Sequence, residues 1–149
     1  MQLDEWPGWT SWTLFRDLNW SLVPQGPGTY MIAARHRLNR AVGVDEEGIL
    51  DIGTSKRLRK RLSEFWGCAT GTRPAGHMAG WRFAYYEMAV HFPLATLHIC
   101  WRPAATAEEA AREEARLIDA YVRQHMESPP LNYSASWRHL EAEEPVETV

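Results

Sequence analysis

Two carboxylates in the sequence stand where the surrounding pattern calls for apolar side chains. Asp51 interrupts the apolar run 49–52, although Asp is depleted in strands. Glu114 falls on an apolar stripe with helical spacing over residues 110–121, whereas Glu113 lies off that stripe. The alternatives are a solvent-exposed strand face for Asp51, and a stripe-edge position or an arginine ion pair for Glu114. Because departures from the local pattern tend to mark functional sites, both carboxylates are candidate site residues.

A dense run of positive charge follows Asp51 closely. Five of the six residues 56–61 are Lys or Arg, and Arg57 and Arg61 are four residues apart, so they share one face of a helix. Such a run is usually a solvated helix face, but this one begins at an expected helix N-terminus, which also attracts anions. Phosphate binding is the functional interpretation, with these candidate contacts: Lys56, Arg57, Lys60 and Arg61.

The six histidines show no spacing typical of a metal-binding pair. His77 stands apart from the others because it adjoins the glycine-rich segment 67–76, directly after the basic run. We interpret it as a candidate proton shuttle and nucleic-acid contact, and the other histidines as surface or core residues.

Three strands and three helices must position these side chains. The segments with the composition of short strands are 28–34, 48–53 and 94–101. The first two are predicted to pair antiparallel across a long connection, and simple alternation puts Asp51 on the face of Ile49.

The predicted helices are about 54–65, 77–92 and 106–125. Thr54 or Ser55 is expected to cap the first, and Thr106 with Glu109 forms a capping box for the third. The middle segment fits a helix or a strand, and we favour the helix.

The chain of 149 residues has the length of one globular domain, and 45% hydrophobic residues argue against disorder. We expect a Trp-rich extension packed on the domain as a short helix or turn over 1–27, the domain itself over 28–137, and an acidic, solvated tail over 138–149.

The net charge of −3 argues against a broadly basic surface. Four Glu residues after position 140 account for more than this charge, and the basic residues are 14 Arg and 2 Lys, so any basic surface is local and dominated by arginine. Two distant cysteines, the lack of a signal peptide at the start and the lack of a long apolar run predict a cytoplasmic protein with no membrane segment.

Taken together, these residues resemble the GIY-YIG nuclease superfamily, which is named for two tripeptides on adjacent antiparallel strands. The tripeptides read Gly28-Thr29-Tyr30 and Asp51-Ile52-Gly53 here. The basic run ending at Arg61 resembles the helix after the second tripeptide. The segments around Glu114 and Asn132 resemble the family's Glu-containing helix and terminal Asn element, so the resemblance covers residues 28–132.

The resemblance implies an α+β fold with a small three-stranded antiparallel sheet flanked by helices, and hydrolysis of a phosphodiester with one Mg²⁺ or Mn²⁺ ion. Glu114 would be the metal ligand and Arg61 would neutralise the scissile phosphate. Tyr30 would orient or deprotonate the attacking water, and Asn132 would support the site.

Two positions depart from the family pattern: Asp51 replaces a Tyr, and Phe65 stands where many members have His or Tyr. Three readings follow. The first is an active endonuclease in which Asp51 joins Glu114 as a metal ligand or hydrogen-bonds the water. The second is a fold that binds DNA, possibly single-stranded, or RNA without cutting it. The third is a module that binds a protein partner or a second copy of itself.

Overall fold

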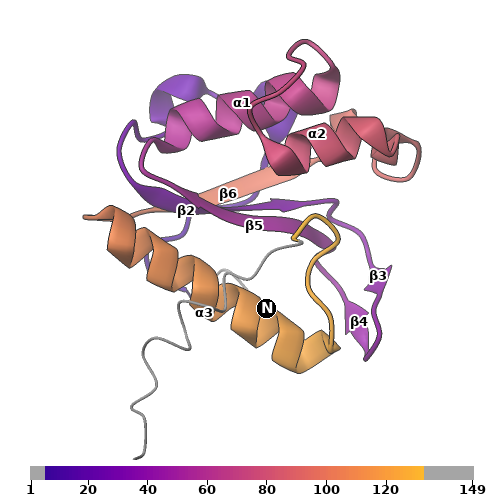
Figure 1. The fold of residues 1–149 in the computed structure, drawn as a ribbon. Coiled ribbons are helices and arrows are strands. Elements are labelled where there is room, and N and C mark those ends of the chain that lie inside the picture. Colours follow the sequence, from indigo (N-terminus) through magenta and orange to yellow (C-terminus); the bar gives the residue numbers. More distant parts are fainter. Residues whose placement is uncertain (1–5, 133–149) are drawn as a thin grey trace, which may run out of the picture.

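The computed structural model describes residues 6–132, and its centre is an antiparallel sheet with helices on both faces (Figure 1). In spatial order the strands are β1 (Thr13–Leu14), β6 (His98–Pro103), β2 (Gly28–Ala33) and β5 (Ile49–Ser55). The expectation of an α+β fold with an antiparallel sheet is confirmed, but the sheet has four strands rather than three.

The additional strand comes from the Trp-rich N-terminal segment, where a short helix or turn was predicted. Thr13 and Leu14 pair with Ile99 and His98 of β6, and the 3-10 turns η2 (Phe15–Asp17) and η3 (Trp20–Leu22) follow. The segment therefore belongs to the sheet itself, because its backbone forms hydrogen bonds with the otherwise unpaired edge of β6.

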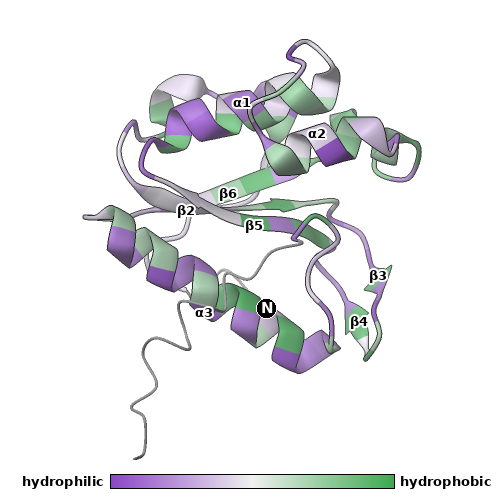
Figure 2. Cartoon of the chain, viewed as in Figure 1, coloured by the Kyte–Doolittle hydropathy of each residue, from purple (hydrophilic) through white to green (hydrophobic). Residues whose placement is uncertain are grey.

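Helices α1 (Leu58–Thr70) and α2 (Met78–Tyr85) cover one face of the sheet, and α3 (Ala107–His125) covers the other (Figure 1). Both faces of β2 are buried: Tyr30 and Ile32 pack in the core under α1 and α2, and Met31 packs in the core under α3. Figure 2 shows the hydrophilic side of α3 turned away from the sheet.

The element boundaries differ from the predicted ones where strand pairing competes with helix formation. Thr54 and Ser55, expected to cap the first helix, still pair with Thr29 and Gly28, so β5 continues through them and α1 begins only at Leu58. The helix then runs to Thr70, beyond the predicted end near residue 65, and stops at Gly71, whose φ of 77° is left-handed.

Other segments agree more closely with their predictions. Thr106 caps α3 by accepting a hydrogen bond from the Glu109 backbone N–H at 3.1 Å. The segment favoured as helix over 77–92 holds α2 and the short turn η4 (Met88–Val90). The strand predicted over 94–101 begins later, at His98, after the 3-10 turn η5 (Leu94–Thr96).

The connection between β2 and β5 carries a small ribbon, in which β3 (Leu38–Asn39) pairs with β4 (Val44–Asp45). The predicted acidic tail over 138–149 and the end of the predicted domain at 137 lie outside the described residues. Within residues 6–132, no helix combines the length and apolarity needed to cross a membrane.

Candidate active site at the edge of the sheet

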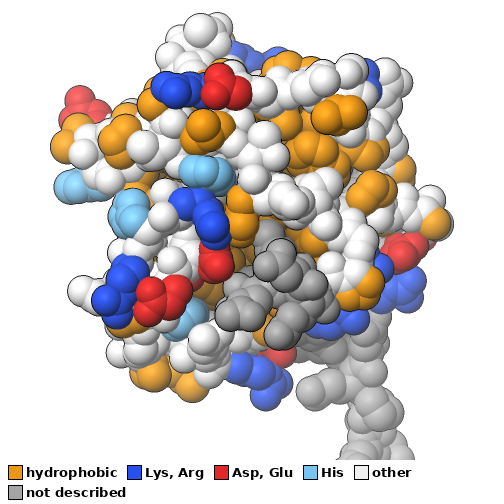
Figure 3. Space-filling view, turned by 180° about the vertical axis from the view of Figure 1, so that it is seen from behind, with side chains coloured by type: hydrophobic (Ala, Val, Ile, Leu, Met, Phe, Trp, Pro, Cys, Tyr) orange, Lys and Arg blue, Asp and Glu red, His pale blue; other side chains and the backbone are white. Residues whose placement is uncertain are grey.

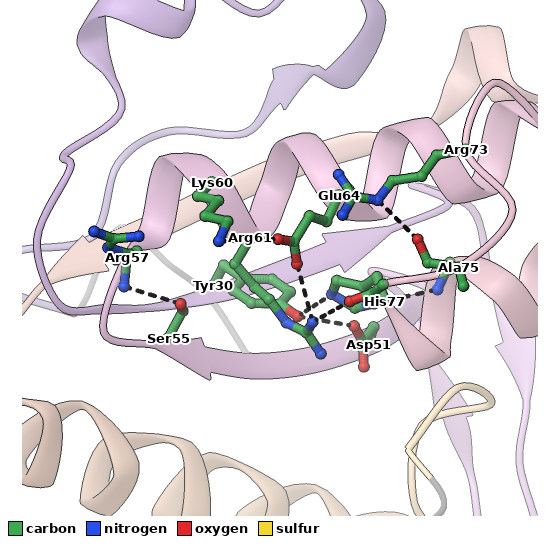
Figure 4. Close-up of polar contacts among 12 residues, drawn as sticks. Tyr30, Asp51, Ser55, Arg57, Lys60, Arg61, Glu64, Arg73, Ala75 and His77 are labelled. Carbon is green, nitrogen blue, oxygen red and sulfur yellow. Dashed lines mark hydrogen bonds and ion pairs between the residues drawn. The ribbon is translucent and has the colours of Figure 1, made fainter.

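Tyr30 forms the centre of the candidate site. It is 2% exposed, and its hydroxyl lies 2.8 Å from Nε2 of His77 and 3.5 Å from Oδ2 of Asp51 (Figure 4). Burial, and then the charge of Asp51, raise the pKa of the Tyr30 phenol well above its ordinary value, and the guanidinium of Arg61 opposes that rise. The phenol therefore stays protonated and acts as a hydrogen-bond donor in the resting protein.

Gly53 makes room for the Tyr30 ring. Tyr30 and Gly53 are opposite each other in the register of β2 and β5, and a Cβ atom at Gly53 would lie 2.3 Å from both Cζ and the hydroxyl oxygen of Tyr30. The ring therefore crosses over the bare backbone of Gly53 toward the free edge of β5, the last strand in the sheet.

A β-bulge brings Asp51 to the side of Tyr30. The register shifts between Ile32, opposite Asp51, and Ala33, opposite Ile49, which leaves Leu50 as an extra residue in β5. The prediction that Asp51 shares a face with Ile49 is therefore wrong, since the simple alternation is interrupted between them. Ile49 packs in the core under α3, whereas Asp51 accepts a hydrogen bond from Tyr30.

The pKa of the Asp51 carboxyl is raised, because the group is buried and lies near another carboxylate. Asp51 is 4% exposed, and burial, followed by the charge of Glu114, raises its pKa to about 7. Arg61, the Tyr30 hydroxyl and Arg82 act in the opposite direction. The carboxyl is thus able to exchange a proton near neutral pH.

His77 is buried beneath the site and serves as the N-cap of α2. Its Nδ1 accepts a hydrogen bond from the Gly80 backbone N–H at 3.3 Å, and burial with the charge of Arg61 lowers its pKa to about 3. The neutral ring therefore carries its proton on Nε2 and donates it to the Tyr30 oxygen. Burial leaves His77 in contact with Tyr30 rather than open to a nucleic-acid strand.

Phe65 lies edge-on to His77, with ring centroids 5.2 Å apart, and is fully buried. The position that departs from the family pattern on α1 is thus apolar, and the polar partner of Tyr30 comes from the start of α2 instead. Nothing in the spacing of the sequence predicts this pairing, because 47 residues separate Tyr30 from His77.

Arg61 reaches from α1 across the Tyr30 ring (Figure 4). Its Nη1 donates to the Gly76 carbonyl at 2.7 Å and to Glu64 at 3.3 Å. A guanidinium carries five N–H donors, and a further hydrogen bond from Arg61 to the Tyr30 hydroxyl helps to lower the pKa of that phenol. Glu64, which sequence reasoning missed, was recognisable by its position three residues after Arg61 on the same helix face.

The basic run lines two hollows on the surface of α1. One has a volume of about 280 Å³ and the other about 400 Å³; Arg57 and Lys60 line both, Lys56 and Arg61 line only the first, and Arg59 lines only the second. On the face opposite to that of Figure 1, basic and acidic side chains lie next to one another (Figure 3). A carboxylate, Glu64, also lines the first hollow, beside Lys60 and Arg61.

Glu114 acts on the site from α3, on the other face of the sheet. Its negative charge raises the pKa of both Asp51 and Tyr30. Its neighbour Glu113, predicted to lie off the apolar stripe, is the more deeply buried of the two carboxylates. Glu113 forms ion pairs with Arg102, at 3.2 Å, and with Arg116, and its Oε1 accepts a hydrogen bond from the Trp9 indole N–H at 3.4 Å.

Asn132 holds the free edge of β5 next to Asp51. Its Oδ1 accepts from the Ile52 backbone N–H at 2.9 Å, and its Nδ2 donates to the Ile52 carbonyl at 2.8 Å. The Asn132 side chain thus takes the place of a neighbouring strand at this one residue of β5.

We predict that replacing Asn132 with Ala lowers the free energy of unfolding by about 1–3 kcal/mol, because two hydrogen bonds to the backbone are lost. Asn132→Asp should also destabilise, since a carboxylate cannot donate to the Ile52 carbonyl. Urea denaturation measures both, with Asn39→Ala, at an exposed position in β3, as the control. Equal stability of the Asn132 and Asn39 variants would show that the hydrogen bonds from Asn132 to the Ile52 backbone do not stabilise the fold.

The chain matches no protein-family model, and comparison with curated proteins and with solved structures gives no match either. The case for a function therefore stands on the geometry of this site.

Proposed function

We propose that the chain is a divalent-metal-dependent endonuclease of the GIY-YIG type, which hydrolyses phosphodiester bonds of DNA. The observation that carries the proposal is the electrostatic coupling of four side chains from four elements: Tyr30 on β2, Asp51 on β5, Arg61 on α1 and Glu114 on α3. Each of the other three shifts the pKa of Asp51. Tyr30 and Asp51 are buried while Arg61 and Glu114 are partly exposed, and a coupled set of ionisable groups of this kind is typical of catalytic sites.

The donor set suits a hard cation. Among residues 6–132 no cluster of three or more His, Cys, Asp or Glu side chains is disposed to hold a metal ion. Mg²⁺, however, is commonly held by one or two carboxylates, with water and substrate oxygens completing the shell. Glu114 would hold the ion, with Asp51 near it. When bound, Mg²⁺ or Mn²⁺ supplies positive charge for the leaving 3′-oxygen.

The side chains of this protein would divide the remaining work. Arg61, fixed by Gly76 and Glu64, directs its guanidinium toward the scissile phosphate. Asp51, with a pKa of about 7, accepts the proton of the attacking water. Tyr30 keeps its own proton and orients Asp51 and the water, with its oxygen held by the N–H of His77. This division favours the orienting role for Tyr30 over the role of base.

The proposal is tested by incubating the full chain with labelled single- and double-stranded DNA in EDTA, Mg²⁺ and Mn²⁺. We expect metal-dependent cleavage by the wild type and by Glu108→Gln, an exposed carboxylate on the same helix, and no cleavage by Glu114→Gln. A wild type that is inert with both metals, or a Glu114→Gln variant that still cuts, would overturn the proposal. DNA binding without cleavage would favour the non-cutting module instead.

A further inference from the structure

The outward face of α2 carries a cluster of exposed aromatic side chains beside the candidate site. Trp81 is 40% exposed and Tyr85 is 64% exposed, and their rings are stacked with centroids 4.7 Å apart and planes 16° from parallel. Tyr86 meets Tyr85 edge-on at 5.0 Å, and its exposure is similar. We refer to Trp81, Tyr85 and Tyr86 as the aromatic platform.

The platform is held rigidly relative to the site. The opposite face of α2 is buried through Ala79, Gly80 and Phe83, and a Cβ at Gly80 would lie 2.7 Å from the Phe65 carbonyl of α1. The same helix begins at His77, whose ring is hydrogen-bonded to Tyr30. Movement of the platform relative to Tyr30 would therefore break this close packing or the bond to Tyr30.

Positive charge continues from the site to the platform. Arg82, next to Trp81 on α2, lies near enough to Asp51 to lower its pKa. On α1, Arg57, Lys60 and Arg61 line one hollow, and the Arg61 guanidinium reaches the Gly76 carbonyl just before the start of α2 (Figure 4). A chain of phosphates that passes Arg61 thus has further cations on α1 and one on α2, the helix that carries the stacked rings.

Cations along a path with aromatic rings beside them are the combination that binds unpaired nucleotides, since every base has a face that can stack on a ring. A base pair inside a duplex has both faces covered already. A protein partner would account for the exposed rings but not for the cations that continue along α1.

We propose that the aromatic platform stacks unpaired bases next to the scissile phosphate, so that the substrate is a single-stranded or locally unpaired nucleic acid. The substrate assignment rests on the proposed nuclease function, but the binding itself is measurable without cleavage.

The test is a fluorescence-anisotropy titration of the full chain in EDTA with an oligo-dT strand, an oligo-rU strand and a DNA duplex of equal length. Trp81→Ala and Tyr85→Ala should each weaken binding of the single strands about tenfold, and change duplex binding little. Trp81→Phe and Tyr85→Phe keep a ring and should keep affinity, which separates loss of stacking from loss of fold. Val90→Ala, a highly exposed apolar position on η4, is the matched control.

Equal effects of the Ala variants on the binding of duplex and single strands, or no effect on either, would overturn the proposed stacking on the platform, even if the wild type cuts DNA. The same holds if the Ala variants abolish self-association without changing affinity for the strands. A selective loss of single-strand binding supports the platform even if no metal activates cleavage, so the two proposals fail separately.

Discussion

Asp51→Asn is expected to stabilise the metal-free protein above about pH 8 while reducing cleavage by about 10²- to 10⁴-fold. Burial and the charge of Glu114 raise the pKa of Asp51 from 3.8 to about 7. Between these pH values the folded protein holds a proton that the unfolded chain has lost. Stability contributed by this group therefore falls as pH rises through the window, and above it the cost amounts to about 4 kcal/mol.

Asparagine has no charge to bury, and its Oδ1 still accepts the Tyr30 hydroxyl proton. It cannot take a proton from water, so stability and activity should move in opposite directions. Thermal denaturation in EDTA, near pH 5 and near pH 8, measures the first, and the metal-dependent cleavage assay measures the second.

Asp119→Asn, at the Asp119–Arg123 ion pair on the exposed flank of α3, provides the control for a general charge effect. The gain in stability of the Asp51 variant over the wild type should be about 2–3 kcal/mol larger near pH 8 than near pH 5, because part of the window lies below pH 5. A gain of the same size at both pH values, or no gain at either, would show that Asp51 ionises normally in the folded protein.

Gly53→Ala should destabilise the protein by about 1–3 kcal/mol and remove cleavage activity. The added Cβ would lie 2.3 Å from the Tyr30 hydroxyl and Cζ, so the ring must leave its position over β5. The hydroxyl would then lose its contacts with Asp51 and His77. Urea denaturation and the cleavage assay measure the two effects.

Two further variants make this prediction specific. Gly26→Ala adds a methyl group with no heavy atom within 4 Å, so it should change neither quantity. Combining Gly53→Ala with Tyr30→Leu shortens the obstructing side chain, so stability should recover in part while activity stays absent. If Gly53→Ala behaves like Gly26→Ala, the Tyr30 ring does not depend on the bare backbone of Gly53.

Some of the site was predictable because the relevant contacts are close in sequence. The capping of α3 by Thr106 involves a backbone N–H three residues away, and the basic face of α1 follows from the helical spacing of Arg57 and Arg61. The pairing of 28–33 with 49–55 follows from two short apolar runs bounded by turn residues. Elements of this kind are stabilised largely by local propensity and periodic packing, so they can be predicted from the sequence alone.

Other features depend on contacts between residues far apart in the chain. The bulge at Leu50 turns Asp51 toward Tyr30, and one extra residue in a strand reverses an alternation that the sequence alone implies. The pairing of Thr13 and Leu14 with β6 adds a strand that has no local signal of its own, since two residues are too few for a periodicity.

The two carboxylates of α3 illustrate the same limit. Helical spacing predicts that Glu114, and not Glu113, faces the sheet, but it takes only that one packing surface into account. The N-terminal segment supplies a second surface, against which Glu113 is buried with Arg102.

The sequence by itself thus determined the main elements, their antiparallel pairing and which polar residues depart from the local pattern. Only the tertiary structure decided that His77 rather than residue 65 bonds to Tyr30, and that Asp51 is buried with a pKa near neutrality. The physical reason is that burial and electrostatic coupling depend on which elements meet. Which elements contact one another is determined by long-range packing, and no local pattern in this sequence predicts it.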